Sequence, residues 1–278
     1  PMWTRHDFRD LIRPAAIGMI HLEPLPGSCR WQGDMAAVLA AALADADALA
    51  AGGLTAVMME NYHDAPFFPG RVPSETVAAL SVAVQAVRTT FPHLAVGVNV
   101  LRNDVASALG IAAATGARFV RVNVHVGAAV TDQGTIEGRA WHTLRRRREL
   151  GVTAGLLADV RVKHARPLGE RPLAEEVQDL RLRGLADGVI VSGTATGAGT
   201  DPAEVAAVRQ AVPDCPVLIG SGATAGTVGT FFPAADGIIV GTTLQEPDPR
   251  SGRSRVSPER TREFVAALNS ASRKDPSR

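Results

Sequence analysis

The chain has 278 residues, of which 46% are hydrophobic and 21% are charged, and its formal net charge is +1. This composition excludes an intrinsically disordered chain, and the near balance of charge argues against a polyanionic partner such as nucleic acid. No apolar stretch reaches the roughly 18 to 20 residues of a membrane span, and the first ten residues lack the apolar core of a signal peptide, so we expect a cytoplasmic protein.

Short β-branched runs alternate with Ala-rich stretches of helical pattern along the whole chain. The runs predict eight strands, at residues 15–20, 54–59, 94–100, 117–124, 152–160, 186–192, 216–220 and 235–240. Helices are predicted at residues 34–51, 73–90, 104–115, 139–150, 173–183, 202–211 and 258–270, with a short one at 225–232. Two strings, ADGVIVSG at 186–193 and ADGIIVGT at 235–242, are nearly identical, which indicates a repeated structural unit.

Eight βα units in roughly 250 residues predict an α/β fold, a single (β/α)8 TIM barrel. We expect one domain over residues 1–278, with 1–13 as a lead-in, 246–257 as a loop and 271–278 as a polar tail. A doubly wound sheet is the alternative, but it usually opens with a Gly-rich dinucleotide loop. No GxGxxG motif follows the first predicted strand.

The active face of such a barrel lies at the carboxyl ends of its strands, and polar residues follow every predicted strand. In chain order they are His21 and Glu23; Glu60, Tyr62, His63 and Asp64; Asn99, Arg102 and Asn103; Arg121, Asn123 and His125; Asp159, Arg161, Lys163 and His164; Ser192, Thr194 and Thr196; Ser221; and Thr242 and Thr243. Alternation predicts that Arg121, Asn123 and His125 share one face, as do Asp159, Arg161 and Lys163. The arginine run at 145–148 is interpreted as a solvated helix face.

Lys163 is the main catalytic candidate. Of 29 basic residues only Lys163 and Lys274 are lysines, which indicates that an ammonium group is needed at position 163. We expect Lys163 to activate a carbonyl or to stabilise charge, and the flanking Asp159 and Arg161 would shift its pKa in opposite directions.

Acid and base roles are assigned to Asp159, Glu60 and the histidines, and a row of amide and guanidinium groups completes the site. The full set of catalytic candidates is Lys163, Asp159, Glu60, His21, His164, Asn99, Arg121 and Asn123. No cofactor is required by this set. A divalent metal ion held by His21, Glu60 and Asp159 is a variant that the residue types suit.

Glycines at the ends of the last strands predict a phosphate site. Gly220, Ser221 and Gly222 end the seventh strand, Gly241 and Thr242 end the eighth, and Ser192 and Gly193 extend the same surface from the sixth. Glycines let backbone N–H groups approach an anion, and many TIM barrels bind phosphate on these loops. The alternative is that the glycines only form tight turns.

Glu60 and Asp159 are predicted to face each other across the barrel mouth. Two carboxylates over one cavity either bind a cation or separate in pKa into an acid and a base. In the alternative structural interpretation each is neutralised by its own arginine, Arg121 or Arg161, and the two never share a site.

Seven separated motifs resemble the BtpA family over roughly residues 12–268. The first is IGMIHLEPLPGS at 17–28, and the others are ENYHDAPF at 60–67, GVNVLRND at 97–104, FVRVN at 119–123, TDQG at 131–134, ADV with VKHA at 158–165, and IVSG at 190–193. The resemblance implies a TIM barrel similar to the ribulose-phosphate-binding group. Family members more usually read Glu-Asn-Phe-Gly-Asp in the second motif, so Tyr62 and His63 add an imidazole here.

The family name implies a role in photosystem I biogenesis in cyanobacteria, but members also occur in non-photosynthetic organisms and beside sugar-metabolism genes. We therefore hypothesise an enzyme acting on a small phosphorylated molecule, a sugar phosphate or nucleotide-like compound, by lyase, isomerase or aldol-type chemistry; self-association into a homo-oligomer is compatible with this. The alternative is a non-enzymatic assembly or stability factor. It predicts a binding surface outside the barrel mouth and tolerance of substitution at Lys163 and Asp159.

Overall fold

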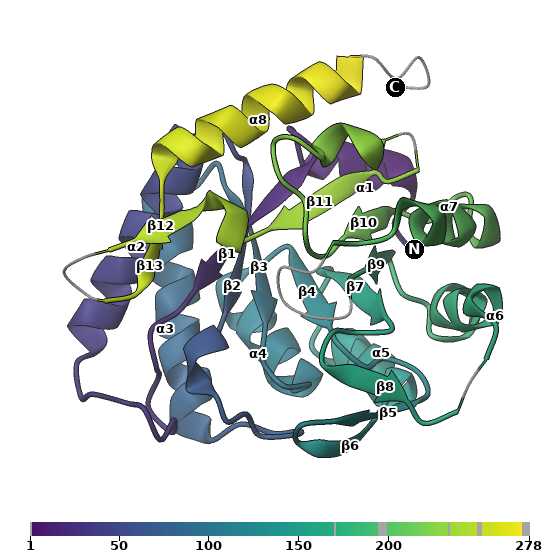
Figure 1. Ribbon diagram of the computed structural model, residues 1–278. Coiled ribbons are helices and arrows are strands. Elements are labelled where there is room, and N and C mark those ends of the chain that lie inside the picture. The colour runs from purple at the N-terminus through teal and green to yellow at the C-terminus, as the bar shows by residue number, and fades with distance from the viewer. Residues whose placement is uncertain (1, 170, 194–198, 233, 249–251, 274–278) are drawn as a thin grey trace.

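The computed structural model describes residues 2–169, 171–193, 199–232, 234–248 and 252–273. Eight parallel strands close into a barrel in the order β1-β11-β10-β9-β7-β4-β3-β2 (Figure 1). They are β1 (Ala16–His21), β2 (Ala56–Glu60), β3 (Ala95–Asn99), β4 (Phe119–Val122), β7 (Gly155–Val160), β9 (Gly188–Val191), β10 (Val217–Ile219) and β11 (Gly237–Val240). Each predicted strand overlaps one barrel strand, so the TIM barrel is confirmed.

Helices cover the outside of the barrel. They are α2 (Met35–Ala51), α3 (Ser74–Thr90), α4 (Val105–Thr115), α5 (Ala140–Glu149), α6 (Leu173–Gln178), α7 (Pro202–Ala211) and α8 (Pro258–Arg273). Aspartate side chains cap α2, α4 and α7 at their first turns. The predicted helix at 225–232 is wrong in type, because only a 3₁₀ turn forms at Val228–Thr230, where Gly226 and Gly229 disfavour a longer helix. Within the described ranges, no helix has the length and apolarity to cross a membrane.

Two small antiparallel sheets were not predicted. β5 (Ala128–Thr131), β6 (Gly134–Glu137) and β8 (Ala165–Pro167) form a three-stranded sheet built from the segments that follow β4 and β7 (Figure 1). β12 (Gln245–Pro247) pairs with β13 (Ser254–Val256), so the segment 246–257 is not simply a loop. Strands of three or four residues are too short for an alternating pattern to reveal them.

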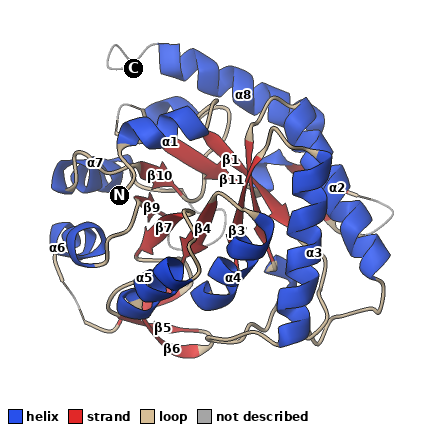
Figure 2. Ribbon diagram, turned by 180° about the vertical axis from the view of Figure 1, so that it is seen from behind, coloured by secondary structure: helices blue, strands red, loops and turns tan. Residues whose placement is uncertain are grey.

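The N-terminal segment closes the barrel at the end opposite the mouth. Residues 1–13, expected as a lead-in, contain helix α1 (Arg5–Leu11), which lies across the amino ends of the strands (Figure 2). Phe8 and Ile12 are fully buried and belong to the same apolar cluster as Ile17 and Phe119 inside the barrel. The segment is therefore part of the core.

The repeated ADG strings place two buried carboxylates at this closed end. Asp187 accepts hydrogen bonds from the backbone N–H of Leu156 (2.8 Å) and from Arg147 (2.6 Å). Asp236 likewise accepts from the backbone N–H of Val217 (3.0 Å), and arginines of α1 and α7 neutralise it. Arg147 belongs to the run expected to be a solvated face, and this expectation is wrong for it because Asp187 requires a cation.

The barrel interior changes from apolar to polar along the strands. Its lower layers are filled by residues such as Met19, Met58 and Leu157. Because successive side chains alternate between the two faces of a strand, the next interior position toward the carboxyl end lies two residues later. Those positions are occupied by His21, Glu60, Asn99, Arg121, Asp159, Ser192, Gly220 and Gly241.

Candidate active site

A small pocket of about 60 Å³ opens at the carboxyl ends of the strands. Nine of the predicted site residues line it: His21, Glu60, Arg121, Lys163, Gly220, Ser221, Gly222, Gly241 and Thr242. Its floor is the last apolar layer of the interior, including Met19 and Ile239. We call this the mouth pocket. The predicted site residues Asp159, His164, Asn99, Asn123, Ser192 and Gly193 do not line it.

Arg121 and Asp159 form a buried two-point ion pair beneath the mouth pocket. Arg121 donates from Nε and Nη2 to the two carboxylate oxygens of Asp159, at 2.8 and 2.7 Å. Asn123 Nδ2 donates to Asp159 Oδ2 at 3.0 Å, and Ser192 Oγ donates to Oδ1 at 3.3 Å. Burial is the largest single effect and acts to lower the pKa of Arg121, but the charge of Asp159, its hydrogen bonds and the charge of Glu60 together raise that pKa.

These four hydrogen bonds occupy the lone-pair positions of the Asp159 carboxylate. Asp159 therefore has no lone-pair position left for a metal ion, and it does not line the mouth pocket. The expectation that Asp159 and Glu60 share one cavity as acid and base is wrong for this reason. The alternative interpretation describes Asp159 correctly, because its own arginine neutralises it.

Three other predicted residues point elsewhere. Arg161 does not share the face of Asp159, because β7 ends at Val160 and the backbone turns at Arg161 with a φ of 51°. Its guanidinium pairs with Glu176 outside the barrel at 3.1 Å. His164 is exposed, and the His125 ring is hydrogen-bonded to the carbonyl of Gly184 at 2.8 Å. Alternation failed here because it holds only while the strand continues.

His21 and Glu60 form the polar side of the mouth pocket. Glu60 Oε2 accepts a 2.5 Å hydrogen bond from Asn99 Nδ2, and Glu60 Oε1 lies 3.9 Å from His21 Nε2. Gln245 Nε2 lies 3.2 Å from His21 Nδ1, and donation by this amide assigns the ring proton to Nε2. Burial lowers the pKa of His21 to about 4 against the attraction of Glu60, so the ring is neutral at pH 7.

Aromatic stacking fixes the plane of the His21 ring. Tyr62 lies parallel to it, with ring centroids 4.3 Å apart and planes at 20°. The His63 ring lies edge-on to Tyr62, with ring centroids 5.3 Å apart. The additional imidazole of this chain therefore does not line the mouth pocket.

Lys163 reaches the pocket from the loop that follows β7. Its Nζ donates to the carbonyl oxygen of Gly220 at 3.4 Å, and Arg102 Nη2 donates to the Lys163 carbonyl oxygen at 2.5 Å. Burial is the main cause that lowers the pKa of Lys163, and the nearby charge of Arg121 adds to this effect, against Glu60. Arg102 and Gln245 were not among the sequence candidates. Arg102 could have been predicted, because it is a charged residue shortly after the end of β3. No pattern in the sequence indicated Gln245.

The glycine loops form the opposite side of the pocket. A Cβ at Gly220 would lie 2.2 Å from Ser192 Oγ, and Gly222 has a φ of 76°, so both positions favour glycine. Ser192 lies behind this loop against Asp159, and Gly193 donates its N–H to Ser221 Oγ at 3.0 Å. Thr194 and Thr196 lie outside the described residues.

The structure does not bring together the three residues predicted to hold a metal ion, His21, Glu60 and Asp159. His21 and Glu60 are neighbours, but the carboxylate of Asp159 is occupied by Arg121. Among the residues that the structure describes, no group of three or more His, Cys, Asp or Glu side chains is placed to hold a metal ion.

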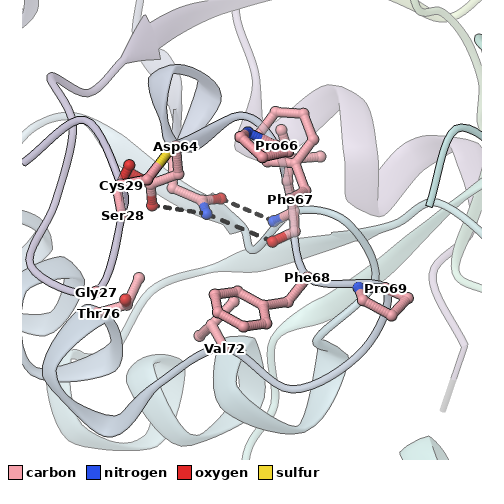
Figure 3. A pocket seen from close by; sticks show the side chains of 12 residues that line it. Gly27, Ser28, Cys29, Asp64, Pro66, Phe67, Phe68, Pro69, Val72 and Thr76 are labelled. Atoms are coloured by element: carbon pink, nitrogen blue, oxygen red, sulfur yellow. Dashed lines mark hydrogen bonds between the residues drawn. The ribbon is translucent and has the colours of Figure 1, made fainter.

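A separate cavity of about 320 Å³ lies between the loops after β1 and β2 (Figure 3). Asp64 forms its inner edge, accepting from Leu25 N–H at 2.8 Å and from Asn61 Nδ2 at 3.1 Å. Asn61 also accepts from Leu101 N–H at 2.7 Å. The motif at residues 60–67 therefore has two roles. Glu60 lines the mouth pocket, whereas Asn61 and Asp64 hold the surrounding loops by hydrogen bonds.

We expect Arg121→Met to lower the free energy of unfolding by about 3–5 kcal/mol, because it leaves the Asp159 charge buried without its cation. The double variant Arg121→Met/Asp159→Leu should regain most of this loss. Urea unfolding of the wild type and the variants measures both. Arg146→Met, which breaks an exposed pair with Glu149, is the control and should change stability by less than about 0.5 kcal/mol. Equal losses at Arg121 and Arg146 would contradict the argument.

Acid should destabilise the protein through His21. Its pKa is about 4 in the folded chain and about 6.5 in the unfolded chain, so the unfolded state takes up the proton first as pH falls. Between pH 6.5 and 4.5 this group should remove about 2 kcal/mol of stability. His21 is mostly buried, with a side chain that is 11% exposed. Urea unfolding at both pH values should therefore show a smaller loss of unfolding free energy for His21→Asn than for the wild type. Identical drops would exclude His21 as the cause.

Comparison with solved structures shows the fold. A 2-keto-3-deoxy-6-phospho-gluconate aldolase from Zymomonas mobilis superimposes with a TM-score of 0.55 at 15% identity, covering 98% of each chain. An OMP decarboxylase from Leishmania donovani gives a TM-score of 0.59 at 14% identity, covering 96% of this chain and 98% of that one. These superpositions confirm the expected TIM-barrel fold.

Comparison of sequences shows the family. The BtpA family profile matches residues 13–270. The chain is 44% identical over 264 residues to the photosystem I biogenesis protein BtpA of Synechocystis sp., covering 94% of this chain and 90% of that protein. It is also 44% identical over 258 residues to an uncharacterized protein of Thermococcus kodakarensis, covering 92% and 95%. The chain therefore belongs to the BtpA family.

Proposed function

We propose that this protein is an enzyme that acts on a small phosphorylated carbonyl compound by lyase, isomerase or aldol-type chemistry at the mouth pocket. The observation that carries the proposal is the half-buried Lys163 amine, which lines the mouth pocket together with Glu60 and the glycine loops. A lysine whose pKa is lowered holds more of the neutral amine at pH 7, and the neutral amine is the nucleophile in imine formation.

In the proposed reaction the lone pair of Lys163 Nζ attacks the carbonyl carbon of the substrate. The carbonyl oxygen takes up protons and leaves as water, which yields an iminium ion. The iminium then accepts the electron pair of an adjacent bond as that bond breaks. Glu60 is the base that takes up the released proton, and the neutral His21 offers its Nε2 proton beside Glu60.

The phosphate of the substrate is assigned to the glycine side of the pocket. Gly220, Ser221, Gly222, Gly241 and Thr242 line that side, and small residues allow an anion to approach the backbone closely. The charge of Arg121 is balanced by Asp159, so the assignment of the phosphate rests on the glycine loops and not on a net positive charge of the pocket.

An assembly or stability factor is the second candidate, supported by the name of the Synechocystis relative at 44% identity. The archaeal relative of equal identity is uncharacterized, so the name does not extend across the family. This candidate predicts that substitution of Lys163 leaves function unaffected, and the next experiment separates the two.

Sodium cyanoborohydride should trap a covalent adduct on Lys163 when the protein is incubated with a phosphorylated keto sugar such as ribulose 5-phosphate. Lys163→Arg should lose both the adduct and turnover of any substrate, because a guanidinium does not form an imine, while the fold is retained. Lys274 is the one other lysine in the sequence, so Lys274→Arg is the matched control and should keep the adduct. Peptide mapping by mass spectrometry locates it. Full turnover by Lys163→Arg would remove Lys163 from the mechanism.

Inorganic phosphate should bind the wild type and raise its melting temperature by mass action. Gly222→Ala should weaken phosphate binding about tenfold, because alanine disfavours the positive φ that shapes the loop. Gly134→Ala is the control, since Gly134 also has a positive φ but is the first residue of β6 and does not line the pocket. Calorimetric titration measures both affinities. Equal phosphate affinity in the two variants would argue against the assigned site.

A further inference from the structure

The cavity of about 320 Å³ between the loops after β1 and β2 has no part in the proposed reaction (Figure 3). It shares no lining residue with the mouth pocket. Its volume lies at the lower end of the roughly 300–1,000 Å³ that small-molecule sites enclose. We call it the outer cavity. It has the size of a ligand site and is separate from the place assigned to the phosphate.

Three of the BtpA-like motifs meet at the outer cavity. The segments 17–28, 60–67 and 97–104 supply seven of its twelve lining residues, among them Ser28, Asn61, Asp64 and Phe67. None of the seven takes part in the reaction proposed for the mouth pocket. These motifs therefore build two separate surfaces, and the proposed reaction accounts for only one of them.

Asp64 is the one acidic residue in the described lining of the outer cavity, and no basic residue accompanies it there. Its hydrogen-bond donors are all uncharged: the N–H of Leu25 at 2.8 Å, Asn61 Nδ2 at 3.1 Å and the Ser28 hydroxyl. Asp64 forms no ion pair with any residue that the structure describes. Burial raises the pKa of Asp64, although the three donors oppose this shift. A carboxylate buried among neutral partners is unfavourable, and a bound cation would offset that cost.

The Asp64 carboxylate keeps a position for a further donor. Its two oxygens offer about four lone-pair positions, and the three donors named above fill three of them. Asp64 is 8% exposed and lines the cavity, so its accessible surface meets the contents of the cavity. In Figure 3 it lies with Cys29 at one side, and Phe67 and Phe68 lie at the other. A ligand between these two sides would touch both a carboxylate and an apolar wall.

The rest of the wall is suited to the hydrocarbon part of such a ligand. Its apolar members are Pro66, Phe67, Phe68, Pro69, Val72 and Leu101. Phe68 is 45% exposed, so a ligand that covers it would remove apolar surface from water. Aromatic rings also attract cations at their faces. A metal ion is disfavoured, because it needs several oxygen ligands and no group of three His, Cys, Asp or Glu side chains surrounds one position in the described parts of the chain.

We propose that the outer cavity is a second ligand site, which takes a small organic cation. Its ammonium group donates to Asp64, and its aromatic or branched hydrocarbon body packs on Phe67 and Phe68. The site is independent of the reaction proposed for Lys163. It adjoins the mouth pocket along the chain, since Glu60 lines the mouth pocket and the next residue, Asn61, lines the outer cavity.

Cys29 is a natural reporter of binding, because it lies in the lining of the outer cavity. The sequence has two cysteines, of which Cys29 is exposed and Cys215 is buried, so iodoacetamide should modify Cys29 alone in the folded chain. Benzylammonium should slow this modification with a saturable dependence that gives its dissociation constant. Benzyl alcohol has the same shape without the charge and should bind about tenfold more weakly, as expected for one hydrogen bond to a charged group. Absence of protection by benzylammonium, or equal protection by the two compounds, would overturn the proposal.

Asp64→Asn removes the charge and should abolish the preference for benzylammonium over benzyl alcohol. Glu75→Gln is the matched control, since Glu75 is exposed beside the lining residue Thr76 but does not itself line the cavity. This control should bind benzylammonium as the wild type does. Cys215 reports folding, because it stays unmodified only while it is buried. A preference that survives in Asp64→Asn, or is lost equally in Glu75→Gln, would overturn the proposal. If Asp64→Asn does not fold, the two compounds on the wild type decide.

Calcium chloride tests whether the cation must be organic. At equal ionic strength it should leave the modification rate of Cys29 unchanged, because one carboxylate is too few ligands for calcium. Protection by calcium equal to that by benzylammonium would identify an inorganic cation site and overturn the proposal.

Lys163→Arg separates this proposal from the proposed function. The variant should bind benzylammonium as the wild type does, because Lys163 does not line the outer cavity. Failure of the imine experiment with intact protection of Cys29 counts against the reaction alone. Normal imine trapping without protection of Cys29 counts against the second site alone.

Discussion

The buried pair between Arg121 and Asp159 organises the whole carboxyl end of the barrel. Desolvating two charges is costly, and the cost is offset only when geometry is good and the remaining hydrogen-bond positions are filled. Here the two-point contact and the added donors Asn123 and Ser192 meet both conditions. The pair tethers side chains from three strands, β4, β7 and the end of β9, so the polar layer has one arrangement.

The chemistry of the mouth pocket follows from that pair. Arg121 is paired with Asp159 and also lines the mouth pocket, where its charge adds to burial in lowering the pKa of Lys163. Glu60 is left as the carboxylate of the mouth pocket, beside a histidine that burial keeps neutral. The acid and base set of the mouth pocket therefore consists of an amine of lowered pKa at Lys163, the carboxylate of Glu60 and the neutral imidazole of His21. Asp159 is not part of this set, because it does not line the pocket.

The fold alone does not choose the reaction. An aldolase and a decarboxylase share this barrel at 15% and 14% identity, and barrels support many chemistries through the residues at their mouths. What distinguishes this chain is local: Lys163 held through its backbone by Arg102, His21 held between Tyr62 and Gln245, and a three-stranded sheet beside the mouth. These features, and not the barrel, carry the functional inference.

The sequence by itself determined the barrel and most of the mouth pocket, because period-two alternation of buried strands places residues such as Glu60 and Gly220 at predictable interior positions. It did not determine the fate of Arg161 or Asp159. Arg161 turns outward because the strand has ended, and alternation carries no information beyond a strand. Asp159 is a partner of Arg121 and not a base, because pairing depends on which side chains meet across the interior, and only the closed tertiary structure decides that.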